Sequence, residues 1–439
     1  MTGNYVEFTE EMKKEYTILV PNMLPMHFKM IMRVLKNYGY NMELLETEGK
    51  HISEKGLRYV HNDTCYPAIL VIGQFLDAIE SGKYDPHKVA LILFQTGGGC
   101  RASNYVSLLR KALAKAGYGY IPVIGFSFGG IEKHSGWNIT LPIYLKLFHA
   151  LLYADLLMNL QNQCKVYEKH AGDTDLICEK WLSKLTSTDK SISLKGGRGA
   201  KALYKSIIDD FAAIEKVEKP KLKVGIVGEI FVKYSPLGNN NLADFLVKNG
   251  AEPVIPGFID FLLYCIYNVV LDKKLYGFKS PLYTAYGLVY KVVLKKQKEL
   301  IDVMREDGRF DAPTPFDVTL TLAKGIISFG TKMGEGWLLT SEMVELYHSG
   351  AVNIGCTQPF GCLPNHICGM GMMKPLKEIY PDINIVAIDY DAGATAVNQE
   401  NRIRLMLSNA RLANEVGETE KSSPDICTSN VYRRMLNTC

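Results

Sequence analysis

The sequence predicts an α/β protein of two Rossmann-like lobes, each a parallel sheet covered by helices, with a helical insert and a cleft between the lobes. Three observations predict this class. Short apolar runs of strand type alternate with amphipathic helical segments in both halves of the chain. Strand signals fade between residues 140 and 213, where helical periodicity continues. The 439 residues also exceed the roughly 250–300 that a single core holds.

The first lobe, residues 1–140, has a regular alternation of strands and helices. Each expected strand is a short apolar run, and each expected helix repeats apolar residues three and four positions apart. The expected strands are residues 16–21, 41–45, 89–94 and 121–125, and the expected helices are residues 26–38, 67–80 and 105–116. Such a series predicts a parallel sheet with helices on both faces.

The rest of the chain divides into a helical connection, a second lobe and a tail. The connection, residues 141–219, has helical periodicity in residues 144–160, 176–185 and 203–211. In the second lobe, residues 220–416, we expect strands at 224–227, 252–255, 352–355 and 384–388, and helices at 242–249, 258–305 in several pieces, 338–349, after Pro364 and at 398–412. The polar tail, residues 417–439, contains Cys427 and Cys439, to which the sequence assigns no role.

Composition excludes several classes of protein. Apolar residues make up 47% and charged residues 22%, which is typical of a folded globular protein. The net charge is only +4 and the basic residues are scattered, so we expect no nucleic-acid or membrane partner. The N-terminus lacks a signal-peptide pattern, and the longest apolar stretch, residues 258–271, contains Asp260 and Asn268. We therefore expect a cytoplasmic protein, whose ten cysteines stay reduced and free for metal binding or catalysis.

The first candidate segment is His61-Asn62-Asp63-Thr64-Cys65-Tyr66-Pro67, which comes directly before an apolar helix. Asn, Asp and Thr cap helices, and proline suits the first turn, so Cys65 is expected at a helix N-terminus. Backbone N–H groups there favour a thiolate, the form that binds metals. The alternative is a small buried side chain at a helix start.

The second segment, Gln95-Thr96-Gly97-Gly98-Gly99-Cys100-Arg101, lies between a strand and a helix. Three glycines allow the backbone to pass close to a bulky group. A phosphate would fit this loop, but no Walker Lys-Ser/Thr pair follows the glycines. We therefore favour Cys100 as a ligand, with Arg101 offsetting negative charge or holding an acidic substrate group.

The third segment runs from Gly355 to His366 and contains Cys356 and Cys362. Cys368 follows Cys362 by six residues. Prolines and glycine make this loop rigid enough to direct two sulfur atoms toward one point. All three segments are expected beyond the carboxyl ends of strands, the edge where open α/β sheets bind ligands. Thiolates select iron–sulfur clusters, zinc or copper(I), and a four-cysteine structural zinc site is the alternative.

Other residues are second candidates. Glu229 follows the strand at 224–227 and could act as an acid, a base or a substrate anchor, although a cap or an ion pair is the alternative. His61 and His366 flank two of the thiols and could move protons or bind metal. Cys265 lies in an apolar helix, where burial is the simpler explanation.

These segments, together with Val-Gly-Glu-Ile at 227–230 and Gln-Thr-Gly-Gly-Gly-Cys-Arg-Ala-Ser-Asn-Tyr at 95–105, resemble the acyl-CoA dehydratase activase-related proteins. Those proteins are relatives of the 2-hydroxyacyl-CoA dehydratases and double-cubane cluster proteins. The resemblance implies that Cys65, Cys100, Cys356 and Cys362 bind an iron–sulfur cluster. With Cys265 and Cys368 added, six thiols could hold two cubanes or a double-cubane 8Fe-9S cluster, and we expect this ahead of a single 4Fe-4S cluster.

The resemblance also implies a reaction and its partners. A separate ATP-hydrolysing iron–sulfur activator protein would pass electrons at low potential to this component, which would reduce an acyl-CoA or another small molecule in an anaerobic cell. Glu229, Arg101 and His366 are the expected catalytic residues, and a homodimer is expected because relatives dimerise. Two alternatives stay open: a non-catalytic electron-storage or relay subunit, and a CoA- or nucleotide-binding protein with structural thiols.

Overall fold

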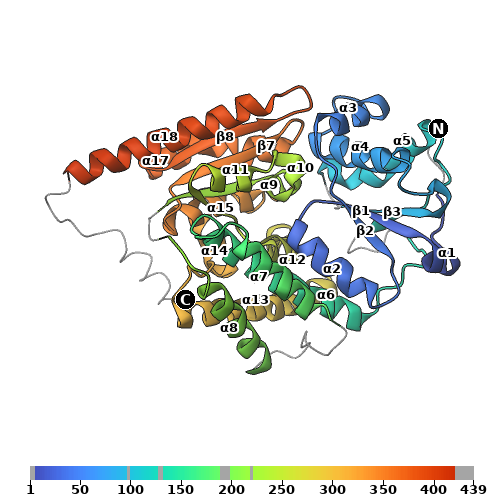
Figure 1. Ribbon diagram of the computed structural model, residues 1–439, viewed down its shortest axis with the longest axis horizontal. Helices are drawn as coiled ribbons and strands as arrows, with labels where there is room; N and C mark the ends of the chain where they lie inside the picture. Colours follow the sequence, from blue (N-terminus) through green and yellow to red (C-terminus); the bar gives the residue numbers. More distant parts are fainter. Residues whose placement is uncertain (1–4, 96–98, 127–131, 188–197, 218–220, 421–439) are drawn as a thin grey trace.

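A computed structural model of the chain describes residues 5–95, 99–126, 132–187, 198–217 and 221–420. The described strands form two separate four-stranded sheets, one in each lobe (Figure 1). The first sheet has the order β2-β1-β3-β4, with β1 at Thr17–Pro21, β2 at Met42–Leu45, β3 at Val89–Phe94 and β4 at Val123–Phe126. The second has the order β6-β5-β7-β8, with β5 at Leu222–Gly228, β6 at Ala251–Val254, β7 at Asn353–Pro359 and β8 at Asn384–Tyr390.

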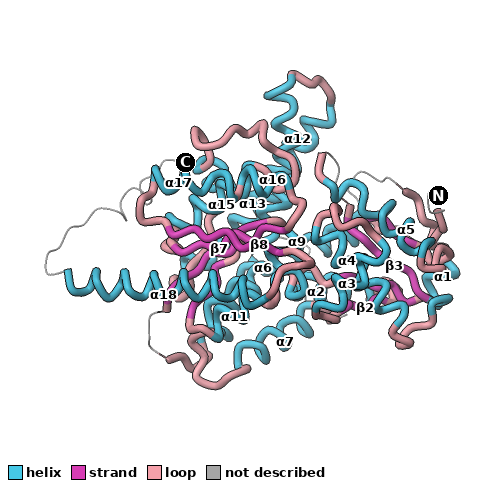
Figure 2. The backbone as a smooth tube through the Cα atoms, turned by 90° about the horizontal axis from the view of Figure 1, so that it is seen from above, coloured by secondary structure: helices cyan, strands magenta, loops and turns pink. Residues whose placement is uncertain are grey.

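All strand pairs are parallel, which confirms the predicted fold class of two parallel-sheet lobes. Helices cover the sheets, as Figure 2 shows for the second lobe. In each sheet the strand order reverses between the first and third strands of the lobe, β1 and β3 or β5 and β7. Open α/β sheets bind ligands beyond the carboxyl ends of strands at such a reversal. The segments that follow β3, β5 and β7 are therefore the ones to inspect.

The helices of the first lobe include two that the sequence pattern did not predict. They are α1 (Glu10–Glu15), α2 (Pro25–Lys36), α3 (Lys50–Tyr59), α4 (Tyr66–Glu80) and α5 (Tyr105–Lys115), with short 3₁₀ helices η1 (Pro86–Lys88) and η2 (Arg101–Asn104). α1 and α3 are the unpredicted ones. A Cβ on Gly56 of α3 would lie 2.1 Å from the Ile69 carbonyl oxygen of α4, so these two helices cross closely only because that residue is glycine. The α3–α4 crossing fixes the turn that carries Cys65.

A layer of long helices lies beside both sheets. It contains α6 (Leu141–Lys165), α7 (Asp173–Leu185), α8 (Arg198–Ala212), α12 (Phe258–Tyr276), α13 (Pro281–Asp307) and α14 (Phe316–Leu322). Their apolar side chains form one core that also takes in Met30 of α2 and Trp337 of the second lobe. The helical connection expected at residues 141–219 thus packs against helices from later in the chain.

α6 is the one helix in the described part that is long and apolar enough to cross a membrane. The sequence pattern had pointed to residues 258–271 as the longest apolar stretch instead. Of the apolar window of α6, 56% is buried inside the protein. Burial of this kind is typical of a core helix, because the core is as apolar as a bilayer.

The remaining helices belong to the second lobe: α9 (Ile230–Tyr234), α10 (Pro236–Asn239), α11 (Leu242–Lys248), α15 (Trp337–His348), α16 (Leu363–Cys368), η3 (Met370–Met372), α17 (Met373–Ile379) and α18 (Ala396–Glu420). The sequence analysis missed the short helices α9, α10 and α14. It also ended the third strand of this lobe at Gly355, whereas β7 continues through Pro359. The extension moves Cys356 from the loop into the strand, since β7 pairs with β8 along its whole length.

Candidate functional site

Three cysteines from the two lobes meet where the lobes join. Cys65 is the N-cap of α4, Cys100 is the N-cap of η2 after β3, and Cys362 is the N-cap of α16 after β7. The charge of Cys65 raises the pKa of Cys100, and the charge of Cys100 raises the pKa of Cys362. The three thiols therefore form one group. Cys65 follows α3 rather than a strand, which corrects the expectation that every thiol lies just beyond a strand end.

The Cys362 loop packs directly on the turn that contains Cys65. The Tyr66 backbone N–H donates a hydrogen bond of 3.0 Å to the Phe360 carbonyl. Gly361 has φ +78°, and a Cβ there would lie 3.1 Å from the Cys65 Cα. Glycine is needed at residue 361 for both its backbone conformation and this close approach. The contact therefore fixes the position of the Cys362 loop of the second lobe against the Cys65 turn of the first lobe.

Burial and local hydrogen bonds act against each other on the three thiols. Burial raises the pKa of each of them, that of Cys100 to about 11. Backbone N–H groups of Ala68, Ala102 and Asn365 partly offset this for the three sulfurs. At neutral pH the thiols thus keep their protons unless a metal displaces them. Once ionised, each sulfur has a backbone donor ready.

Tyr105, at the start of α5, supplies a side-chain donor to the group. Its hydroxyl lies 2.9 Å from the Cys65 sulfur. Burial raises the pKa of Tyr105 well above its usual value, and the charge of Cys65 raises it further. The phenol therefore stays protonated and donates to the sulfur when that sulfur is a thiolate.

Two carboxyl groups complete the site from the second lobe. Glu229 is the N-cap of α9 and accepts a hydrogen bond of 3.0 Å from the Val232 N–H. Glu335 accepts one of 2.9 Å from the Ile230 N–H of the same helix. Burial raises the pKa of both groups, and the Glu335 charge raises that of Glu229 further. Two carboxylates so close in an apolar setting favour sharing a proton, because both cannot ionise cheaply.

Cys356 has a different environment from the three thiols. Its side chain is fully buried inside β7, packed with Val227, Met343 and Leu376. Burial raises its pKa to about 12, and the charges that reach it are those of Asp389 and Glu342. A Cβ on Gly369 would lie 2.9 Å from its sulfur. This environment is that of a packed core side chain, and a role for Cys356 as a ligand stays an untested prediction.

Cys265 of α12 and Cys368 of α16 share a neighbour with the site. The charge of Glu335 raises the pKa of both, to about 12 and about 11 respectively, after the larger effect of burial. The same charge acts on Cys100 and Cys362. Glu335 is thus the common neighbour of four thiols, and it connects the two reserve cysteines to the main group.

The other predicted site residues lie at the rim. Arg101 donates a hydrogen bond of 2.7 Å to the Asp63 carbonyl, and its charge lowers the pKa of Cys65. The exposed His366 ring donates through Nδ1 to the Cys362 carbonyl at 2.7 Å. His61 pairs with Asp63 at 3.2 Å, and both side chains are 75% exposed. Gly97, Gly98, Cys427 and Cys439 lie outside the described residues.

The side chains that meet at the site are thiols, and thiolates bind iron–sulfur clusters, zinc or copper(I). Among the described residues, no three His, Cys, Asp or Glu side chains are arranged to hold one ion. Two buried thiols, Cys65 and Cys362, and the half-buried Cys100, each with a backbone donor, would serve as thiolate ligands of iron.

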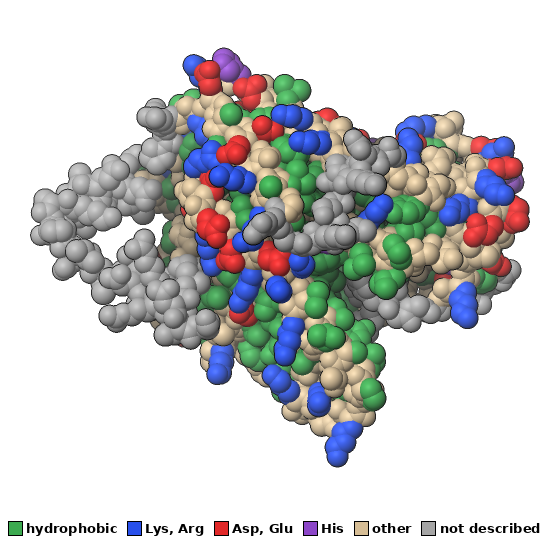
Figure 3. All heavy atoms as spheres, turned by 90° about the horizontal axis from the view of Figure 1, so that it is seen from below, with side chains coloured by type: hydrophobic (Ala, Val, Ile, Leu, Met, Phe, Trp, Pro, Cys, Tyr) green, Lys and Arg blue, Asp and Glu red, His purple; other side chains and the backbone are tan. Residues whose placement is uncertain are grey.

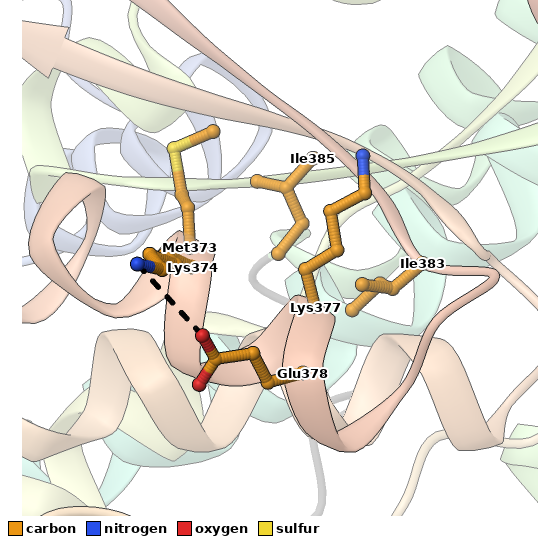
Figure 4. A pocket seen from close by; sticks show the side chains of 6 residues that line it. All are labelled: Met373, Lys374, Lys377, Glu378, Ile383 and Ile385. Atoms are coloured by element: carbon orange, nitrogen blue, oxygen red, sulfur yellow. Dashed lines mark ion pairs between the residues drawn. The ribbon is translucent and has the colours of Figure 1, made fainter.

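A surface pocket lies away from this site. It lies between α17 and the start of β8 and is lined by Met373, Lys374, Lys377, Glu378, Ile383 and Ile385 (Figure 4). Lys374 and Glu378, one turn apart on α17, form an ion pair of 3.9 Å at its edge. Ile383 and Ile385 mark the amino end of β8, opposite to the edge where the thiols meet. We therefore assign this pocket no part in the site.

Comparison with protein-family models finds no match for this chain, and comparison with curated proteins finds none either. The site consequently rests on its own geometry. Sequence reasoning missed Tyr105, although it ends the segment 95–105, and Glu335. The signal for Glu335 was Gly334-Glu335-Gly336, a carboxylate between two glycines directly before an apolar helix.

Proposed function

We propose that this chain holds an iron–sulfur cluster on Cys65, Cys100 and Cys362. In this proposal it is the substrate-reducing component of an ATP-dependent, two-component, low-potential reductase or dehydratase system. The observation that carries the proposal is the convergence of three capping thiols from both lobes beside a buried carboxyl pair. Bound there, a cluster would supply electrons at low potential.

The thiol set favours one 4Fe-4S cluster over a double-cubane. Cys65, Cys100 and Cys362 would hold such a cluster, which would supply low-potential electrons to a substrate. Cys265 and Cys368 are linked to the three only through the charge of Glu335. Their participation would require a larger cluster and a different placement of their side chains.

The carboxyl groups give the chain the means to handle protons. Reduction of a carbonyl or loss of a hydroxyl group consumes protons, and the pair Glu229–Glu335 holds one at neutral pH because burial raises the pKa of both. The Tyr105 hydroxyl orients the Cys65 sulfur and offsets its charge. Arg101 and His366, at the rim, are proposed to meet the acidic group and the leaving group of a small-molecule or acyl-CoA substrate.

Energy input is assigned to a separate protein. The chain has no Walker sequence after its glycines, so ATP hydrolysis would belong to an iron–sulfur activator partner. The eight cysteines in the described part are all free thiols, as a reducing cytoplasmic compartment would keep them. The buried carboxyl pair favours an enzyme over the alternative of a passive electron store, because electron storage alone has no need of it.

The test is analysis of iron and acid-labile sulfide in anaerobically purified protein. We expect Cys65→Ala, Cys100→Ala and Cys362→Ala each to lose most of the bound iron and the thiolate-to-iron absorption. Cys356→Ala and the core variant Cys164→Ala should keep both. Zinc without sulfide in the wild type, or equal iron in all five variants, would refute the proposal.

A further inference from the structure

The part of the molecule that protrudes from the helical layer contains many lysines and no acidic residues between positions 273 and 298. α12 and α13 form a helical hairpin that stands out from the helical layer (Figure 2). Residues 273–298 contain seven lysines and no arginine, aspartate or glutamate. The lysines of this segment are Lys273, Lys274, Lys279, Lys291, Lys295, Lys296 and Lys298. Seven of the 50 basic residues of the chain thus lie in one segment whose sequence contains no acidic residue.

The same hairpin exposes large apolar side chains. Seven of them between residues 275 and 292 are more than two-fifths exposed: Leu275, Tyr276, Phe278, Leu282, Leu288, Val289 and Val292. On α13, Ala285, Leu288, Val289 and Val292 follow the spacing of one helix face, whereas Val293 and Gln297 face the core. Figure 3 shows apolar and basic side chains together on the projecting part. An exposed apolar face of this length is typical of an interaction site.

The hairpin rises from the rim of the candidate site. Lys332 forms an ion pair with Asp272, and its ammonium lies 5.5 Å from the ring centre of Tyr276. The next residue, Met333, accepts a hydrogen bond of 3.2 Å at its sulfur from the N–H of Gly99, the neighbour of Cys100. Two residues later comes Glu335 of the carboxyl pair. A molecule bound to the hairpin base would therefore lie against the loop that carries Cys100.

Charge restricts what can bind there. A second copy related by a two-fold axis would place lysines against lysines, which costs binding free energy. An acidic protein surface is complementary, and electron-transfer complexes bind through small, charge-steered interfaces of this kind. Tyr276 and Phe278, with ring centres 5.7 Å apart, would supply the apolar centre of such an interface.

We propose that the α12–α13 hairpin is the docking surface for an acidic electron-donor protein, which it holds over the Cys100 loop. This inference rests on the proposed function, since only a redox site needs a donor. The donor would have an acidic surface, and the hairpin would bind that surface next to the rim of the site.

The experiment measures binding, with a small, acidic 4Fe-4S ferredoxin as the probe of the docking surface. Lys273→Glu/Lys274→Glu/Lys279→Glu should weaken ferredoxin binding by at least about tenfold, since each reversed charge repels the probe. Phe278→Ser/Leu282→Ser should weaken it as well. The matched controls Lys324→Glu/Lys374→Glu/Lys377→Glu and Leu405→Ser/Leu412→Ser change exposed residues elsewhere and should bind as the wild type does.

Several results would overturn the inference. One is a ferredoxin affinity that does not change with added salt, and another is an equal loss of affinity in the hairpin and control variants. The others are no ferredoxin binding at all, and binding of anionic lipid vesicles that depends on the hairpin without any binding of ferredoxin. A failure of the proposed function would give a different result. If the purified protein contained no iron and sulfide but its hairpin still bound ferredoxin, the cluster proposal would be wrong and the docking proposal would stand.

Discussion

The two lobes share one strand order but differ in the carboxyl groups whose pKa is shifted. In the first lobe the carboxyl groups of Glu7, Glu43 and Glu132 accept hydrogen bonds near the surface, and their pKa values are lowered. In the second lobe the pKa of Asp307, near the surface, is lowered too, but the pKa is raised for a set of acids that are buried or half-buried: Glu229, Glu252, Asp260, Glu335, Glu342 and Glu345. In each of these, burial is the largest cause.

This difference indicates a division of labour at the junction. The first lobe contributes two of the three thiols and the Tyr105 donor, whereas the second contributes Cys362 and the carboxyl pair Glu229–Glu335. The same topology thus offers sulfur ligands on one side and protonated acids on the other. A reductive site needs both, since electrons and protons must reach the substrate together.

The largest effect is expected at the buried ion pair of the second lobe. Lys233 and Glu342 lie 2.8 Å apart with side chains 5% and 4% exposed. Lys233→Met should lower the free energy of unfolding by about 3–5 kcal/mol, because it leaves a buried carboxyl group without its partner. Urea denaturation measures the change.

The first lobe supplies the matched pair. Arg110 and Glu132 are joined at 2.6 Å, with side chains 13% and 20% exposed. Arg110→Met should cost less, about 1–2 kcal/mol, since water can reach the remaining carboxylate. Lys233→Met/Glu342→Leu should recover most of the loss. Equal costs for the two single variants would contradict the contrast between the lobes.

A smaller effect concerns how stability depends on pH, with opposite signs in the two lobes. Burial raises the pKa of Glu345 from 4.5 to about 7. Its contribution is therefore fully present below pH 4.5 and is lost as the pH rises through about 7. Hydrogen bonds from Arg110 lower the pKa of Glu132, so its contribution is present above pH 4.5 and is lost as the pH falls.

Unfolding at several pH values tests both signs. The stability of wild type relative to Glu345→Gln should fall by about 1–3 kcal/mol between pH 4.5 and 8, from about 1.4 kcal/mol per pKa unit less solvent screening. Relative to Glu132→Gln it should fall only on acidification below pH 4.5. If both differences changed in the same direction, the contrast between these two acids would be wrong.

The sequence predicted the eight described strands because each is a short apolar run in a parallel sheet, where both faces are buried. It missed α3, whose crossing with α4 depends on glycines that read as helix breakers. Cys65, Cys100 and Cys362 were predicted because capping residues, glycines and prolines are local signals. Glu335 has a local signal in its two flanking glycines, but its role comes from a hydrogen bond to α9, more than a hundred residues away, which the sequence does not show. Cys356 was placed in a loop because its strand continues through a polar Thr357-Gln358 pair.

The smallest effect is expected at the hydrogen bond between Tyr105 and the Cys65 sulfur. Tyr105→Phe should lower the free energy of unfolding by about 1 kcal/mol and should leave the iron content unchanged, since no ligand is removed. A donor to a ligand sulfur stabilises the electron-rich reduced form, so its loss should make the cluster harder to reduce. A redox titration followed by electron paramagnetic resonance measures this shift to lower potential. Tyr84→Phe, which removes a hydroxyl bonded to Glu43 in the same lobe, is the control and should leave the potential where it is. A potential that rises in Tyr105→Phe, or moves equally in both variants, would show that the first lobe supplies sulfur ligands without tuning them.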